Sequence, residues 1–468
     1  MLRELPAVTR ETAVRVNPRG PAKPVQPTRP GRVGWLVISS WMWHLTRWDG
    51  LFLGTYLVTH LGGKPIDDQL VGVAMFAPML LGSVVAARLR RGLDPRLVVL
   101  GCEVILIPVA AGFAFVVGAR MAEVWMVYPV ELAFGVGGMV NMTAQRELLV
   151  RAAGAERLQR VLSAELTGLS GAMMLGPLLG GVSIGLLGLG AAFALTAALL
   201  AGSVLILCAA SEPRRAPASS ATSPPRAAGR RPPGMPGPAA TSAPAATLRP
   251  PATPGPAPRG SLRRLLGHRQ LAFVLGITVV ANLCYFSFLP LVPVVARRLH
   301  AGATMAGVLG STAGAVQFLV AAALVAWPAR RASAMFAAGV SLCLVCLGLL
   351  AYAPSVVIAL LVLATAGIGQ GLFNNLQTLL LVSSVSRTER PAALGVLTTT
   401  IGVALPLGML ILGISSSLLG AQRGMLVSAV TGLGSLSVIA ALSRWAPGGG
   451  DGAAEARQTS EMLPAAPG

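Results

Sequence analysis

The sequence GVGGMVNMTAQRELL at residues 135–149 has a second version, GIGQGLFNNLQTLLL, at residues 367–381. The two segments align at a fixed offset of 232 residues, which matches Gly135 to Gly367, Gly137 to Gly369 and Gln145 to Gln377. A repeat at so long a spacing is typical of a membrane protein built from two copies of a multi-helix unit. The sequence therefore predicts two related halves, each containing one such segment.

Each half contains six apolar runs near the length of about 20 residues that an α-helix needs to cross a bilayer. The chain has 468 residues, is 54% hydrophobic and only 12% charged, and has a mean hydropathy of +0.70. A water-soluble core cannot bury that much apolar surface, which argues against a soluble enzyme. We expect an all-α integral membrane protein with twelve transmembrane helices in two six-helix bundles. The expected spans are 33–61, 69–88, 97–118, 124–146, 158–186, 190–210, 270–295, 303–327, 332–352, 355–383, 391–418 and 424–445.

The segments outside the spans differ sharply in composition from the spans. Residues 211–265 consist largely of Pro, Ala, Ser, Gly and Arg, a composition that cannot offset the entropy of ordering. We expect a disordered basic tail at 1–32, a bundle at 33–210, a disordered cytoplasmic linker at 211–265, a second bundle at 266–445 and a flexible tail at 446–468. Because the cost of loop closure rises slowly with length, the linker is expected to be a dispensable tether.

The basic residues predict the orientation. The formal net charge is +20, which by itself could indicate nucleic-acid binding. With both termini on the cytoplasmic side, however, 31 of the 37 Lys and Arg residues fall in cytoplasmic segments, as the positive-inside rule requires. We therefore expect a multi-pass protein of the plasma (inner) membrane with both termini cytoplasmic, and no nucleic-acid partner.

Two motifs resemble a known family. The run GPLLGG at residues 176–181 looks like the GPxxGG motif common in exporters, and residues 82–96 occupy the place of a loop signature, with Ala86 where that signature usually has Asp. From residue 33 to 445 the chain resembles the major facilitator superfamily, and more specifically its enterobactin-exporter-like and macrolide-efflux-like branch. The resemblance implies the major facilitator fold, with a substrate pathway between the halves.

Three polar groups fall within the first span, SWMWHLTRWDGLFLG at residues 40–54. A charge deep in a bilayer costs at least about 2.5 kcal/mol, so such residues are functional candidates. Asp49 lies nearest the middle and matches the acid of the family's first helix, so we expect it to take up and release a proton. A structural ion pair with an Arg is the alternative. Glu131 is the second proton-coupling candidate, and Arg47 and His44 are candidates for an ion pair or the cavity.

Helix geometry separates two of these groups. Two positions rotate by about 200° around an α-helix, so Arg47 and Asp49 cannot both point into one cavity. Arg47 is expected to bond another helix or a carboxylate such as Glu131. Glu103 and Glu165 lie nearer the cytoplasmic side, where pairing with Arg88 or Arg160 favours a structural role.

Aromatic, amide and glycine residues supply the other candidates. Aromatic side chains can line an apolar cavity or face lipid, and glycines can form a hinge or merely a tight helix crossing. The cavity candidates are Trp48, Asn282, Tyr285, Phe286 and Asn374. The candidates for gating or helix packing are Gly176, Pro177, Gly180, Gly181, Gly82, Arg88, Gln145 and Gln377.

These features favour a secondary carrier over an enzyme. The chain has no G-x-x-x-x-G-K-[ST] motif, and Cys343 and Cys346 lie in an apolar run without a second Cys/His pair. We expect no metal, no cofactor and no direct use of ATP. The leading hypothesis is a monomer that exports a small amphiphilic or hydrophobic compound in exchange for protons, with membrane lipids around it. The alternatives are uptake by the same fold, and a glycosyl- or lipid-transfer enzyme that uses Asp67 and Asp68. Without such an activity, Asp67 and Asp68 are expected to lie in a solvated turn.

Overall fold

The computed structural model describes residues 30–81, 94–210, 268–327, 329, 331–386 and 389–445, and the regular elements in these ranges are all helices. The N-terminal half contains α1 (Pro30–His60), α2 (Pro65–Phe76), η1 (Ala77–Leu81), α4 (Pro95–Gly118), α5 (Val124–Leu187) and α6 (Leu189–Ala209). The C-terminal half contains α8 (Arg269–Val280), η2 (Ala281–Tyr285), η3 (Phe286–Leu291), α9 (Val292–Arg298), α10 (Ala303–Ala326), α11 (Ala332–Ala351), α12 (Val356–Ser383), α13 (Arg390–Leu419) and α14 (Ala421–Trp445).

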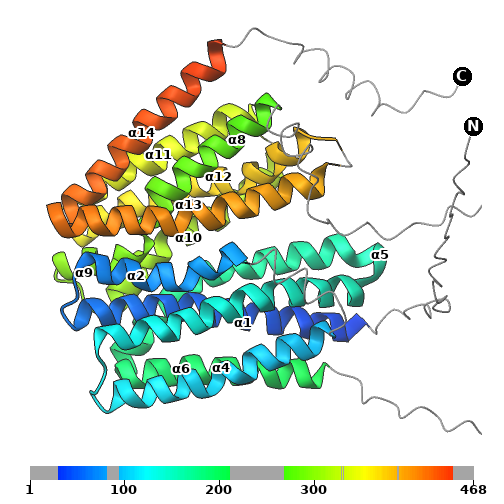
Figure 1. Ribbon diagram of the computed structural model, residues 1–468, viewed down its shortest axis with the longest axis vertical. Helices are drawn as coiled ribbons and strands as arrows, with labels where there is room; N and C mark the ends of the chain where they lie inside the picture. The colour runs from blue at the N-terminus through cyan, green and yellow to red at the C-terminus, as the bar shows by residue number, and fades with distance from the viewer. Residues whose placement is uncertain are drawn as a thin grey trace, which may run out of the picture.

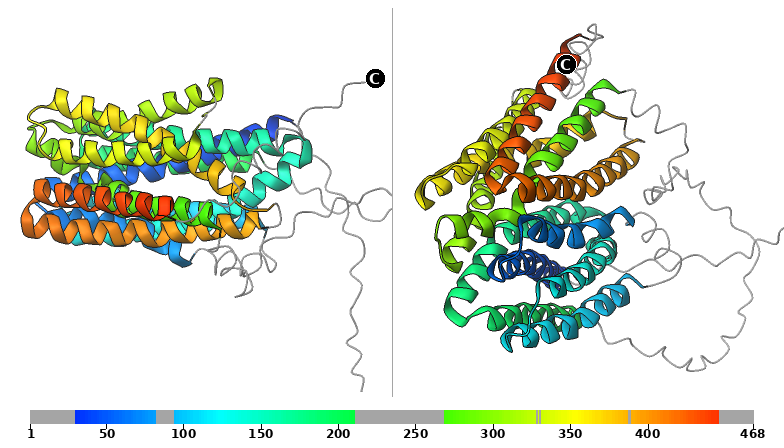
Figure 2. Two further views of the ribbon diagram at one scale, coloured as in Figure 1. Left: turned by 90° about the horizontal axis from the view of Figure 1, so that it is seen from above. Right: turned by 60° about the vertical axis from the view of Figure 1, so that its left-hand side comes forward.

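The two halves lie side by side as separate bundles, with their helices running between two common ends (Figures 1 and 2). One end, here called the turn face, holds the short connections at residues 61–64, 119–123, 188, 299–302, 352–355 and 420. At the other end, the tail face, α1 and α8 begin and α6 and α14 end. The predicted all-α membrane fold is therefore confirmed, whereas Gly82 and Arg88 lie outside the described residues.

Helix α5 supplies two of the expected spans. It is helical over 64 residues, yet Gly138 packs on the side chain of Arg47 in α1 while Gly176 packs on Trp48 next to it. In a straight helix these two glycines would be about 57 Å apart at 1.5 Å per residue. The helix therefore folds back on itself, as Figure 1 shows, and forms a first arm (124–153) and a second arm (160–187). The loop expected at 147–157 is wrong, because the connection is helical.

Nine helical segments in the described part of the chain are long and apolar enough to cross a membrane. They include the second arm of α5 and every helix of the C-terminal half when α8 to α9 is taken as one segment. Helices α1 and α2 and the first arm of α5 are not among them. These three contain the buried charged residues Arg47, Asp49, Asp68 and Glu131, so the less apolar helices hold both proton-coupling candidates, Asp49 and Glu131.

The seventh span is broken. Between α8 and α9 the backbone passes through a π-helical turn, η2, and a 3-10 stretch, η3. Pro290 and Pro293 follow within this region and lack the N–H groups that a regular α-helix would use. Irregular turns of this kind often occur at functional sites.

The repeated segments have the same packing role in each half. Gly135 packs on the backbone of Met75 in α2, and Gly367 packs on the backbone of Ala313 in α10. Gly137 and Gly369 likewise contact the third helix of their own half, α4 and α11. The repeat therefore preserves small residues where neighbouring helices approach closely.

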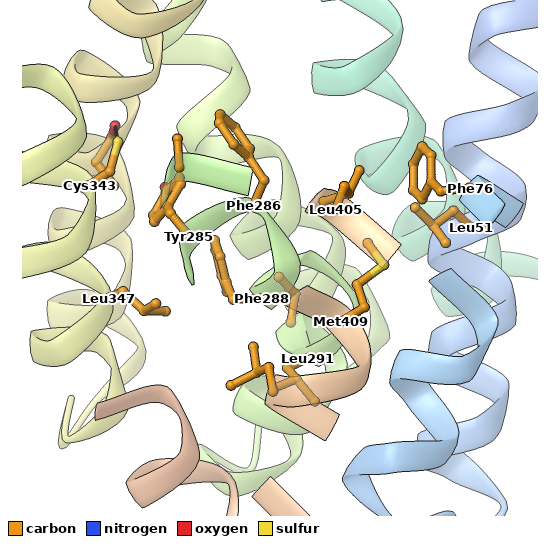
Figure 3. Close-up of a cluster of buried hydrophobic side chains, with 14 of the residues drawn as sticks. Leu51, Phe76, Tyr285, Phe286, Phe288, Leu291, Cys343, Leu347, Leu405 and Met409 are labelled. Carbon is orange, nitrogen blue, oxygen red and sulfur yellow. Dashed lines mark hydrogen bonds between the residues drawn. The ribbon is translucent and has the colours of Figure 1, made fainter. Parts of the chain in front are cut away.

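Two helix pairs join the halves, α5 with α10 and α2 with α13. Gly181 meets Gly307 in the first pair, and Gly72 meets Met409 in the second. Nearer the turn face, the Ile66 N–H donates to Ser417 Oγ (3.0 Å). Apolar side chains of both halves, including Leu51, Phe76, Phe286, Leu405 and Met409, form one continuous buried cluster between them (Figure 3).

Candidate functional site

A pocket lies between the two halves, with an empty volume of about 680 Å³ that includes its opening to solvent. Its walls come from α1, the second arm of α5, η3, α9, α10 and α12, and so from both bundles. Among the residues that the structure describes, no charged side chain lines this pocket, and the polar lining side chains are those of Thr55 and Gln370 together with the indole of Trp48. The apolar and aromatic lining residues are Trp48, Leu51, Phe52, Met173, Pro177, Phe286, Phe288, Leu289, Val292, Leu309, Ala313 and Leu363.

Gln370 is held in place by the aromatic cluster behind it. Its Nε2 donates to the hydroxyl of Tyr285 (2.9 Å), and the Tyr285 ring packs on Phe286 and Phe288 with centroids 5.2 and 5.3 Å away. One N–H of the amide is thus used, and the carbonyl oxygen remains available as an acceptor. Sequence reasoning missed Gln370, although it lies in the repeat opposite Gly138 and interrupts an apolar run.

Asp49 is completely buried inside the N-terminal half. Its Oδ2 accepts a hydrogen bond from Thr196 Oγ1 of α6 (2.7 Å), and its Oδ1 has no partner. Gly180 covers this free oxygen, since a Cβ added there would lie 2.9 Å from Oδ1, and Gly176 packs on the backbone between Trp48 and Asp49. No ion pair joins Asp49 to any basic side chain within the described ranges, so the alternative of a structural ion pair receives no support here.

Arg47 points away from Asp49. Its guanidinium packs against Gly138 in the first arm of α5, and Nη1 donates to Met142 Sδ (3.7 Å). The carboxylate of Glu131, on the same arm, lies against α1 at Gly54. Arg47 and Glu131 interact electrostatically without an ion pair closer than 4.0 Å. Asp49 and Glu131 therefore lie on different sides of α1. Asp49 faces the second arm of α5, whereas Glu131 contacts α1 from the first arm.

The structure brings some cavity candidates together and separates others. Trp48 and Phe286 line the pocket, whereas Tyr285 lies behind the wall. Asn282 donates to the carbonyl of Thr278 in its own helix (2.8 Å), and Asn374 is half-buried elsewhere on α12. Neither asparagine lines the pocket.

The remaining candidates have packing roles or no recorded partner. Gln377 donates to Thr278 Oγ1 (2.9 Å) and ties α12 to α8. Gln145 is buried in α5, and His44 is buried in α1 with Nδ1 unpartnered. None of His44, Arg47, Asp49 and Glu131 lines the pocket, so the ionisable groups lie behind its wall.

The GPLLGG run has two packing faces. Gly176 and Gly180 lie on α1 beside Trp48 and Asp49, whereas Gly181 lies on Gly307 of the opposite half. Pro177 lines the pocket and contacts Gly310 of α10. This run therefore links the buried carboxylate, the pocket and the boundary between the halves.

Asp67 and Asp68 do not form an open carboxylate pair. Asp67 accepts from the backbone N–H of Lys64 (2.8 Å) at the start of α2 and from the hydroxyl of Tyr128 (3.3 Å). Asp68 is completely buried and accepts from Thr59 Oγ1 (2.8 Å). The expectation of a solvated turn is therefore wrong for Asp68, because α2 begins earlier, at Pro65.

Comparisons with known proteins agree on the family and the fold. The family profile described as Major Facilitator Superfamily matches residues 49–408. No curated protein matches the chain. Among solved structures, a bacterial homolog of the human lysosomal transporter Spinster, inward-facing and unoccupied, has a TM-score of 0.64 at 14% identity, covering 91% of this chain and 100% of that one. The nucleoside transporter NupG (TM-score 0.62, 16% identity, coverage 89% and 100%) and the POT family transporter PepTSo (0.63, 11%, 89% and 98%) are also similar.

Proposed function

The chain belongs to the major facilitator superfamily, and we propose that it is a secondary active transporter that exports a small amphiphilic or hydrophobic compound in exchange for protons. One observation carries the proposal. The pocket between the halves has no charged lining residue in the described part of the chain, and Asp49, a buried carboxylate, directly follows Trp48 of the pocket wall. Helix α1 thus connects a ligand site with a proton site.

The lining of the pocket supports an apolar or amphiphilic substrate without net charge. A charged ligand would lose its hydration in this pocket without gaining a counter-charge, which is costly. Aromatic walls with a few placed polar groups are typical of sites for small organic ligands. The free carbonyl of Gln370 and the hydroxyl of Thr55 can hydrogen-bond the polar end of an amphiphile.

Alternating access is supported by the way in which the halves meet. The named contacts between them, from Ile66 and Ser417 to Gly181 and Gly307, lie in the part of the helices toward the turn face. The guanidinium of Arg297 in α9 adds a bond to the carbonyl of Thr59 in α1 (2.7 Å) at the same end. We propose that this state is closed at the turn face, that the turn face is extracytoplasmic, and that rocking of the halves exposes the pocket alternately.

Proton coupling is assigned to Asp49. A carboxylate that is buried without a basic partner is costly when charged and is relieved by taking up a proton. Its packing under Gly176 and Gly180 means that a change in its charge acts on the contact between α1 and the second arm of α5. That arm also contacts the opposite half, so protonation can bias the opening of the halves. Export, rather than uptake, follows the resemblance of GPLLGG to an exporter motif.

Transport in inside-out membrane vesicles tests the proposal. A panel of neutral amphiphiles, organic cations and organic anions is offered with an imposed gradient, acidic inside, and accumulation is measured with and without a protonophore. We expect saturable accumulation of neutral amphiphiles that the protonophore abolishes. Accumulation of none of the panel, or accumulation that is independent of the gradient, would contradict proton-coupled export. Accumulation in right-side-out vesicles, without accumulation in inside-out vesicles, would show that the direction of transport is uptake and not export.

A further inference from the structure

A buried carboxylate lies beside the boundary between the halves, near the turn face. Asp68, in the first turn of α2, is 0% exposed, and its Oδ1 accepts a hydrogen bond from Thr59 Oγ1 of α1 (2.8 Å). The backbone carbonyl of the same threonine accepts a hydrogen bond from Arg297 Nη1 of α9 (2.7 Å), in the other half. Thr59 therefore connects the carboxylate to the contact that joins α1 to α9.

A cavity opens at the turn face beside this contact, with an empty volume of about 700 Å³ that includes its opening to solvent. Its walls come from α1 and α9 and from the turns that follow these helices, so both halves contribute. Thr59 and Arg297 line the cavity together with His60 and His300, whereas Asp68 does not. The carboxylate thus lies directly behind a side chain of the cavity wall.

The carboxylate of Asp68 has no ion pair within the described residues. No basic side chain in these ranges lies within 4.0 Å of it, and its Oδ2 is buried without a hydrogen-bond partner. Arg297 acts on it from a longer distance, and this arginine is itself exposed and bonded to the Thr59 carbonyl. Asp67, one residue earlier in α2, opposes a second negative charge, and Lys64 before it is exposed.

The remaining titratable groups near Asp68 do not neutralise it. Tyr128 of α5 donates to the neighbouring Asp67, and His60 and His300 are exposed at the cavity. In α13, which packs on α2 from the other half, the ionisable side chain is the first residue, at the tail face. All connections of the turn face are among the described residues. Ionised Asp68 would therefore be a buried charge without a close counter-charge in this state, which is strongly unfavourable.

We propose that Asp68 takes up a proton from the extracytoplasmic solvent when the turn face closes, and releases it to the same solvent when the turn face opens. Opening separates α9 from α1, which removes Arg297 from the Thr59 carbonyl and lets water from the cavity reach the carboxylate. A hydrated carboxylate ionises readily, whereas a buried one is relieved by a proton. Asp68 therefore makes closure of the turn face depend on the proton concentration outside.

This inference rests on the proposed function, because it assumes that the halves open at the turn face. It assigns to Asp68 a role different from that of Asp49. Asp68 moves no net charge across the membrane, since it binds and releases its proton on one side. Its effect is that the transporter closes toward the outside only after a proton has been bound there, as an exchange of substrate for protons requires.

The pH dependence of cysteine labelling from the turn face tests the inference. Thr55 lines the pocket one helical turn from Thr59, and Thr55→Cys is made in a chain whose five native cysteines are replaced by Ser. Its labelling rate with an impermeant thiol reagent is divided by that of Met121→Cys, an exposed turn-face residue, which corrects for the effect of pH on the thiol. We expect this ratio to fall about fivefold or more as the outside pH drops from about 8.5 to about 5.5, because protonation favours closure.

Asp68→Asn should abolish this response, because the amide cannot gain or lose a proton in this range. The ratios at the two pH values should then agree within about twofold. Asp67→Asn is the matched control, since it removes the neighbouring carboxylate and can still accept from the Lys64 N–H at the start of α2. It should keep the response of the parent.

Thr59→Val provides a second variant in case Asp68→Asn does not fold. It keeps the shape of the side chain and removes the hydroxyl that donates to the carboxylate. Because that bond favours the ionised form, the midpoint of the pH dependence should move to higher pH by about half a unit or more. A merely structural role of Asp68 predicts no such movement, so an unmoved midpoint in Thr59→Val would contradict the inference.

Three further results would overturn it. They are a pH response in Asp68→Asn as large as that of the parent, loss of the response in Asp67→Asn, and labelling that becomes faster at low pH, which would show that ionised Asp68 holds the turn face closed through Arg297. Failure of the proposed function has a different signature. Thr55→Cys would then remain unlabelled at every pH while Met121→Cys reacts, and without an opening turn face Asp68 would have no gate to control.

Discussion

Gly181 of α5 and Gly307 of α10 touch across the boundary between the two halves, since a Cβ added at Gly181 would lie 2.7 Å from the Cα of Gly307. The same Cβ would lie 2.6 Å from the carbonyl oxygen of Ala303. The obstructing atoms are backbone atoms that cannot rotate away. This contact therefore limits how closely the halves can approach in the state described here.

Gly181→Ala should disfavour the state that is closed at the turn face. Overpacking of this kind costs about 1–3 kcal/mol, so the pocket should open more often toward the turn face. The rate at which an impermeant thiol reagent labels Thr55→Cys from that side, in a chain whose five native cysteines are replaced by Ser, measures the change. Gly171→Ala, with nothing within 4 Å of its Cβ, is the control on the same helix. Equal labelling in both variants would contradict the role of this contact.

Gln69→Leu should have the opposite effect. Gln69 is completely buried in α2 against Gly413 of α13, and neither its Nε2 nor its Oε1 has a partner. An unsatisfied buried amide costs about 1–3 kcal/mol, which opening of the halves would relieve by hydration. Its removal should slow labelling of Thr55→Cys about fivefold or more.

Gln317→Leu is the matched control for Gln69→Leu. Gln317 also has an unpartnered buried Oε1, and its backbone carbonyl lies against Gly371 of α12, away from the contact between α2 and α13. Its replacement should leave the labelling rate within about twofold of the parent, because the contact between Gln69 of α2 and Gly413 of α13 is unchanged. Faster labelling in Gln69→Leu than in the parent would show that the unsatisfied amide does not oppose closure.

Trp48→Ala should weaken substrate binding. The indole lines the pocket and packs near Phe76, with ring centroids 6.2 Å apart. Loss of one large aromatic contact is expected to cost about 1–3 kcal/mol, or about tenfold to a hundredfold in affinity. The KM for export of a neutral amphiphile measures the effect, and Trp35→Ala, a half-exposed residue of the same helix, should leave KM unchanged. A similar KM in both variants would place the substrate elsewhere.

The orientation can be tested by cysteine labelling in intact cells. Because 31 of the 37 basic residues fall on the cytoplasmic side in the twelve-span arrangement, Ser219→Cys in the linker should react with an impermeant reagent only after permeabilisation. Lys64→Cys, exposed at the turn face, should react without permeabilisation. The reverse labelling pattern would show that the chain has the opposite orientation in the membrane.

Much of the fold follows from periodic and compositional signals in the sequence. Apolar runs of bilayer length predicted the helices, and the repeat at Gly135 and Gly367 predicted two related halves, in which these glycines are found to pack in equivalent ways. The continuous helix between the arms of α5 was not predictable, because polar residues such as those at 147–157 are compatible with either a loop or an exposed helix. The irregular turns η2 and η3 were signalled only by Pro290 and Pro293.

The site was less predictable than the fold. Buried acids stand out in an apolar sequence, so Asp49 and Glu131 could be named without coordinates. Their partners could not, because Thr196 is 147 residues from Asp49 and resembles many other hydroxyl residues in apolar spans. Gln370 depends in the same way on the distant hydroxyl of Tyr285. Such contacts arise from the packing of helices and leave no local pattern.

The central claim is that Asp49 couples protons to transport, and Asp49→Asn in proteoliposomes tests it most directly. The amide has nearly the same size and can still hydrogen-bond Thr196, but it cannot gain and lose a proton near neutral pH. Two assays separate coupling from movement of the halves: uphill export driven by a pH gradient, and substrate exchange without a gradient. We expect Asp49→Asn to retain substrate exchange and to lose uphill export. Glu131→Gln is measured in the same two assays for comparison. Uphill export by Asp49→Asn at the rate of the parent protein would contradict the account.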